Sequence, residues 1–133
     1  MFHFGYNCVV VYPKRPNKKH FIDLVKQCED LGIEILDDMP IDLKDFDTIV
    51  DAIFGFSFKG EPREPFKTIL SEMFSSMIPV ISVDVPSGWN VDEGDVNETG
   101  YMPEVLISLT TPKKCSKMFN GRHFIGGRFL PPK

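Results

Sequence analysis

Two aspartates in this 133-residue chain stand where apolar stretches end, and they are the residues best placed to do chemistry. Asp51 lies in TIVDAIFG and Asp84 lies in ISVDVPSGW. A carboxylate on a buried strand has to meet a cation, N–H donors or a polar ligand, because burying it alone is costly. Each aspartate could instead cap its own loop through hydrogen bonds to nearby backbone. Two such residues on separate strands, each followed by a glycine-containing loop, favour a shared site.

A flexible loop, residues 55–63 (GFSFKGEPR), follows the first aspartate. Its two glycines allow close backbone approach, and its serine and lysine supply a hydroxyl and an ammonium group. A helix beginning near Pro65 would direct its free N–H groups at this loop, which favours phosphate. Glu61 and Glu64 would repel an anion, and either could instead accept from a ribose hydroxyl or cap the helix. The loop matches neither the Walker A pattern nor GxGxxG, so its pattern alone has low specificity.

A tight turn, DVPSGW (residues 84–89), follows the second aspartate. The turn would place Ser87 and neighbouring carbonyl groups in the same crevice as Asp51. Carboxylate, hydroxyl and carbonyl oxygens suit a hard cation such as K⁺ or Mg²⁺, although Ser87 could equally be an ordinary turn hydroxyl. The pair Lys113 and Lys114 could be solvated or could reach this crevice from the end of the last expected strand.

The elements that must position these residues alternate between strand and helix. Apolar, β-branched runs predict strands over residues 7–12, 33–36, 48–54, 79–85 and 105–109. Helical spacing predicts one helix from Pro16 to a C′ glycine at Gly32, with its apolar face formed by Phe21, Leu24, Val25, Cys28 and Leu31. A second helix from Pro65 should carry Ile69, Leu70, Met73, Phe74 and Met77 on one face, and the tail from residue 121 reads as irregular.

Strands alternating with helices predict an α/β fold with a mostly parallel sheet and helices on both of its faces. In such sheets ligands bind beyond the carboxyl ends of the strands, where both aspartates are expected. Gly5, preceded by aromatic residues, resembles the C′ glycine of a helix. We therefore expect the chain to begin part-way into its domain.

The composition is 42% hydrophobic and 26% charged, which is typical of one soluble globular domain. A net charge of −4 argues against general nucleic-acid binding, which needs a basic surface. The three cysteines are widely spaced and form no zinc motif, so we expect reduced thiols. No apolar run approaches the roughly 20 residues of a membrane span, so no membrane association is expected.

Four long stretches of the chain resemble the NAD(P)H-hydrate epimerase family, whose members contain a YjeF amino-terminal-type domain. They are VDAIFGFSFKGEPREPF, VDVPSGWNVDEG, PEVLISLTTPKK and FNGRHFIGGRFLPP. The segment YPKRPNKK and its following helix match as well, so the resemblance covers essentially the whole chain. It implies a Rossmann-like three-layer αβα sandwich in which residues 1–133 form the carboxyl-terminal two-thirds of one domain. It also implies epimerisation of the R and S forms of hydrated NADH and NADPH.

The resemblance also assigns roles to particular residues. By similarity Asp51 and Ser87 match ligands of one K⁺ per subunit, and Asp84 contacts the substrate. A substrate-binding loop is matched by Gly55, Phe56, Ser57, Phe58, Lys59, Gly60 and Glu61. Epimerisation requires the hydroxyl-bearing carbon to open and reclose, and a carboxylate within reach can move the proton. Asp84 is the candidate for this catalytic role, with Lys59 as a weaker candidate to orient the substrate.

The chain departs from the family in one respect, which leaves alternatives open. The family's GPGNNGGDG loop, which binds phosphate and supplies another K⁺ ligand, is absent from this sequence, as are the first strand and first helix. We therefore expect little or no epimerase activity from this polypeptide alone. The alternatives are a non-catalytic module that binds a protein such as an apolipoprotein, and a flavodoxin-like nucleotide-binding domain. The resemblance further suggests a homodimer and a cytoplasmic or mitochondrial location, with any targeting segment outside this chain.

Overall fold

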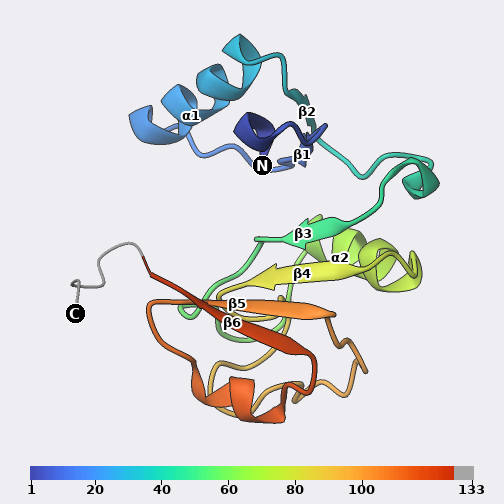
Figure 1. Ribbon diagram of the computed structural model, residues 1–133, viewed down its shortest axis with the longest axis vertical. Coiled ribbons are helices and arrows are strands. Elements are labelled where there is room, and N and C mark those ends of the chain that lie inside the picture. Colours follow the sequence, from blue (N-terminus) through green and yellow to red (C-terminus); the bar gives the residue numbers. More distant parts are fainter. Residues whose placement is uncertain (128–133) are drawn as a thin grey trace. The chain divides into compact units, whose positions relative to one another are not determined.

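A computed structural model describes residues 1–127 of the chain. The chain divides into two compact units, Met1–Asp42 and Leu43–Lys133. Strands and helices alternate along it, and every pair of neighbouring strands is parallel (Figure 1). The fold is therefore α/β and Rossmann-like, as predicted. Its arrangement as one three-layer domain stays a prediction.

The first unit contains one parallel strand pair and one α-helix. The elements are a 3-10 helix η1 (Phe2–Phe4), β1 (Val9–Val11), α1 (Lys19–Asp30) and β2 (Glu34–Leu36). β1 pairs with β2, with Val9 opposite Glu34. Gly32 follows α1 with φ 72°, which confirms the predicted C′ glycine. Gly5 also has a left-handed conformation, with φ 86°, but it closes a 3-10 helix instead of an α-helix.

The helix α1 turns part of its predicted apolar face inward. Phe21, Val25 and Cys28 are half-buried at helical spacing. Leu24 lies at the margin of that face and is 55% exposed, so its predicted place on the face is wrong. The amphipathic pattern located the helix correctly but overestimated the width of its buried side.

The second unit contains a four-stranded parallel sheet in the order β3-β4-β5-β6, the same as the chain order (Figure 1). The strands are β3 (Ile49–Asp51), β4 (Val80–Val83), β5 (Val105–Leu109) and β6 (Arg122–Gly126). The other elements are η2 (Leu43–Asp45), α2 (Phe66–Ser75) and η3 (Lys114–Met118). Because all four strands are parallel, their carboxyl ends lie along one edge of the sheet, where ligands of α/β proteins bind.

The strand β6 corrects the expectation of an irregular tail. Its residues pair with β5 from Arg122 opposite Val105 to Gly126 opposite Leu109. Phe124 and Ile125 are each 57% exposed, as expected for an edge strand with little buried surface. Apolar runs did not predict this strand, because the segment begins with polar residues and has glycines on both sides. Residues 128–133, the rest of the predicted tail, lie outside the described residues.

The helix α2 contributes the expected apolar face with one exception. Ile69, Leu70 and Met73 are buried. The prediction that Met77 belongs to this face is wrong, because the helix ends at Ser75, and Met77 has φ 60° and is 91% exposed. At the other end, Glu64 Oε2 accepts hydrogen bonds from Thr68 N and Oγ1, which agrees with the capping role considered for Glu64. None of the helices in residues 1–127 has the length and apolar character that crossing a membrane requires.

Candidate functional site

The carboxylate of Asp51, at the end of β3, is enclosed by hydrogen-bond donors. The residue is 1% exposed, and its neighbour in the register is Ser82 of β4. Asp51 Oδ2 accepts from Ser82 Oγ at 2.8 Å, from Ser87 N at 2.8 Å and from Tyr101 Oη at 3.3 Å. Asp51 Oδ1 accepts from Ser87 Oγ at 2.5 Å and from Ile53 N at 3.4 Å. Four of these donors come from outside its own loop, so Asp51 does not act mainly as a loop cap.

Ser87 lies beside Asp51, as predicted, in the turn after β4. It is 1% exposed, and both its backbone N–H and its hydroxyl donate to the carboxylate. The hydroxyl oxygen also accepts from Phe54 N at 3.0 Å. Ser87 therefore links the end of β3 to the end of β4, which an ordinary turn hydroxyl would not do.

Asp84, at the end of β4, is held in an unusual backbone conformation. It has φ 74°, and its backbone N–H donates to Ile107 O at 2.8 Å. Aspartate tolerates the left-handed region better than most residues. The residue is 8% exposed, and its Oδ2 accepts from Phe56 N at 2.9 Å. Its Oδ1 is buried and forms an ion pair with the Lys113 ammonium group without accepting an aligned hydrogen bond.

The backbone of residues 53–56 connects the predicted site residues. The N–H of Ile53 donates to Asp51, that of Phe54 to Ser87, and that of Phe56 to Asp84. The short stretch of backbone that leads into the loop thus contacts both aspartates and Ser87. An added Cβ on Gly55 would lie 2.9 Å from Asp84 Oδ2, so a larger residue here would have to displace this carboxylate.

The rest of the predicted substrate loop is mainly open to solvent. Phe56 is 64% exposed, and Ser57, Lys59, Gly60 and Glu61 are exposed too. Phe58 is half-buried and stacks on Phe54, with ring centroids 4.0 Å apart. The loop therefore has a buried side attached to the aspartates and an exposed side that carries the hydroxyl, ammonium and carboxylate groups.

Three residues of this site were not assigned to it from the sequence. Ser82 and Tyr101 both donate to Asp51, and Lys113 pairs with Asp84. The sequence allows Lys113 either to be solvated or to reach the crevice, and its pairing with Asp84 agrees with the second possibility. Ser82 could have been found from the strand register, whereas Tyr101 lies in a long loop with no detectable signal.

Tyr101 connects Asp51 to a different region of the unit. Its ring stacks on Phe74, with centroids 3.9 Å apart, and its hydroxyl also lies 3.0 Å from Ser82 Oγ. Burial, followed by the charge of Asp51, raises the pKa of Tyr101 well above its ordinary value. The phenol therefore remains protonated and can donate to Asp51 over the whole physiological range.

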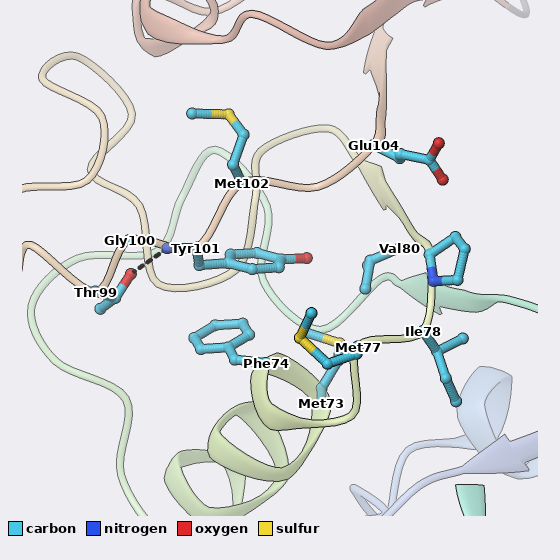
Figure 2. A pocket seen from close by; sticks show the side chains of 11 residues that line it. Met73, Phe74, Met77, Ile78, Val80, Thr99, Gly100, Tyr101, Met102 and Glu104 are labelled. Carbon is cyan, nitrogen blue, oxygen red and sulfur yellow. Dashed lines mark hydrogen bonds between the residues drawn. The ribbon is translucent and has the colours of Figure 1, made fainter. Parts of the chain in front are cut away.

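A hollow of about 450 Å³ lies against the ring of Tyr101. Figure 2 shows this ring between Phe74 on one side and Met102 on the other. Met73, Met77, Ile78 and Val80 supply much of the apolar lining. None of the predicted site residues lines this hollow. Its relation to the site is indirect, through the tyrosine hydroxyl.

The carboxylate of Asp51 and the hydroxyl of Ser87 supply oxygen atoms of the kind that a hard cation prefers. Within residues 1–127, no group of three or more His, Cys, Asp or Glu could hold a metal ion. A cation at Asp51 would thus need hydroxyl and carbonyl oxygens for its remaining ligands. It would also compete with the donors that already occupy the carboxylate.

The chain is similar to proteins of one named family. A family model described as YjeF-related protein N-terminus matches residues 2–115. A Neurospora crassa protein named NAD(P)H-hydrate epimerase is 50% identical over 135 residues, covering 99% of this chain and 57% of the relative. A protein of the same name from Puccinia graminis is 46% identical and covers 99% of this chain and 55% of the relative.

A solved structure is similar as well. The crystal structure of yeast ynu0, YNL200c, superimposes with a TM-score of 0.89 at 44% identity. The match covers 97% of this chain and 58% of the yeast chain. The chain thus spans a little more than half the length of each of these relatives.

Proposed function

Because the chain belongs to the family of YjeF-related protein N-terminal domains, we propose that it takes part in the epimerisation of hydrated NADH and NADPH. Relatives that cover nearly all of this chain are named NAD(P)H-hydrate epimerase. The observation that carries the proposal is the attachment of the loop at residues 53–56 to Asp51, Ser87 and Asp84. The hydrogen bond from Phe56 N to Asp84 Oδ2 supports the proposal that this loop and this carboxylate act together.

Asp84 is the proposed catalytic group. Interconversion of the two hydrated forms requires the hydroxyl-bearing ring carbon to lose its configuration and form it again, and a proton moves in this process. A carboxylate within hydrogen-bond reach can transfer that proton. The buried Oδ1 faces Lys113 Nζ, whereas Oδ2 accepts from Phe56 N and keeps a lone pair for a substrate hydroxyl. The positive charge of Lys113 compensates the negative charge of the carboxylate at this buried position.

The exposed side of the loop is the proposed nucleotide-binding surface. Ser57 and Lys59 would contact the diphosphate, and Glu61 would accept from a ribose hydroxyl. Asp51 and Ser87 would hold the K⁺, whose charge would favour the anionic nucleotide and stabilise the ends of β3 and β4. Lys59 could also help to orient the hydrated ring.

The test compares this chain with the Neurospora crassa relative in an assay that follows interconversion of the R and S forms of hydrated NADH by NMR. The relative should equilibrate the two forms, and asparagine at the position of Asp84 should slow it about 10²-fold or more. Asparagine also tolerates positive φ, so the backbone of the turn should be retained. Unchanged interconversion by this variant would remove Asp84 from the catalytic role.

The 133-residue chain alone is expected to have little or no activity in the same assay. Turnover comparable with that of the relative would refute this expectation. A complete lack of nucleotide binding by the relative would instead favour the protein-binding alternative. The homodimer, the apolipoprotein partner and the cytoplasmic or mitochondrial location remain predictions.

A further inference from the structure

Lys113 places an ammonium group inside the second unit, beside Asp84. Its side chain is 15% exposed, and that of Asp84 is 10% exposed. The ammonium nitrogen donates to Leu109 O at 2.7 Å and forms the ion pair with Asp84 Oδ1. Its neighbour Lys114 differs, since that side chain is 75% exposed and pairs with Asp92 at the surface.

We propose that Lys113 is a positioning residue that fixes the Asp84 carboxylate and, through it, the backbone of the substrate loop at Phe56. The consequence for nucleotide binding rests on the proposed function. The positioning itself rests only on the contacts of the folded protein.

The carboxylate of Asp84 is confined on two sides. The Lys113 ammonium contacts Oδ1, while Oδ2 lies against the backbone of Gly55 and Phe56. The Asp84 backbone is also fixed, because its N–H is bonded to Ile107 O on β5. A buried carboxylate that lost this cationic partner would turn toward water, since an unpaired charge is costly to bury. Lys113 therefore prevents this rotation.

The position of Oδ2 in turn determines the course of the loop. The Phe56 N–H donates to Oδ2, and the next turn is closed by the bond from Phe58 N to Gly55 O at 3.0 Å. Phe58, whose N–H closes this turn, also stacks on Phe54. If Asp84 rotated away, Phe56 would lose its acceptor and the exposed side of the loop would lose its fixed conformation.

The test measures amide hydrogen exchange by NMR in the wild-type chain, Lys113→Met, Lys113→Arg and the matched control Lys114→Met. In Lys113→Met we expect exchange of the Phe56 amide to rise at least tenfold, because its acceptor is no longer held. Lys113→Arg, which keeps the charge, should restore most of the protection, and Lys114→Met should leave it unchanged. The amide of Leu106, in the centre of the sheet, reports general destabilisation and should rise much less than that of Phe56.

Wild-type exchange at Phe56 in Lys113→Met would overturn the proposal, as would an equal rise at Leu106. If Lys113→Met does not fold, as judged from the fluorescence of the buried Trp89, Lys113→Gln is compared in the same way. Binding of NADH, used as a stable probe, is measured in parallel in the Neurospora crassa relative and its methionine variant at the Lys113 position. Suppose that Lys113→Met loses protection at Phe56 but the Neurospora crassa relative binds no NADH. This result would support the positioning role of Lys113 and count against the proposed function alone.

Discussion

Replacing Asp51 by asparagine tests whether the donors around this carboxylate stabilise the fold. The change keeps the size of the side chain but removes its charge and converts one acceptor oxygen into an NH₂ donor. If the remaining oxygen takes the place of Oδ2, it still accepts from Ser82, Ser87 N and Tyr101. The new NH₂ group then faces Ser87 Oγ and Ile53 N, both of which donate to the aspartate.

The magnitude follows from these contacts. Hydrogen bonds to a charged acceptor exceed neutral ones by about 1 kcal/mol each, which gives roughly 3 kcal/mol for the three retained bonds. The donors left without an acceptor cost about 1–3 kcal/mol more. An amide is less costly to bury than a carboxylate, which offsets part of the loss. We therefore expect the free energy of unfolding to fall by about 3 kcal/mol, a large fraction of the roughly 5–15 kcal/mol typical of a domain.

The assay is urea unfolding followed by the fluorescence of Trp89. This residue is the only tryptophan of the chain and is 3% exposed in the same unit as Asp51, so its signal reports on that unit. The matched control is Asp92→Asn on the surface of the same unit, where the carboxylate is 58% exposed. The control should change stability by less than about 0.5 kcal/mol. A loss in Asp51→Asn no larger than in the control would refute the inferred role of the donors.

Further predictions concern pH, cations and the loop. Because the pKa of Tyr101 is raised by burial and by Asp51, the folded chain keeps this proton while the unfolded chain releases it near pH 10, the ordinary value. Stability should therefore fall as pH rises above about 10, by up to about 1.4 kcal/mol per pH unit, and the difference between wild-type and Tyr101→Phe profiles isolates this part. At equal ionic strength, KCl should stabilise the Neurospora crassa relative more than choline chloride does, by about 1.4 kcal/mol at a K⁺ concentration tenfold above Kd, and asparagine at the Asp51 position should abolish the difference. Equal melting curves in the two salts would count against the cation site. Gly55→Ala should displace the Asp84 carboxylate and increase amide exchange at Phe56, which unchanged protection of that amide would contradict.

Much of the fold could be predicted from the sequence because its elements carry strong local signals. The apolar runs located all five expected strands, and Gly32 located the end of α1. The strand β6 was missed because an edge strand needs little apolar surface and its pairing partner is distant in the sequence. Met77 was misplaced because helical spacing continues past the point where the backbone leaves the helix.

The candidate site was only partly predictable, for a related reason. Asp51 and Ser87 could be associated because both follow strands that end at the same edge of a sheet. The role of Tyr101 could not be predicted, because it depends on how a loop without regular structure brings its hydroxyl to Ser82 and Asp51. For Lys113, the sequence showed that it could reach the crevice, but only the folded chain shows the carboxylate that it meets.

The contacts of Asp51 favour the observed alignment of the short strand β3 with β4. A strand of three residues has a weak preference for any one pairing with β4, because only a few side chains are available to distinguish its two faces. A slip by a single residue would turn Asp51 to the opposite face of the sheet, away from the hydroxyl groups of Ser82, Ser87 and Tyr101. The misaligned chain would contain a buried anion without partners. The hydrogen bonds of Asp51 therefore disfavour the shifted register.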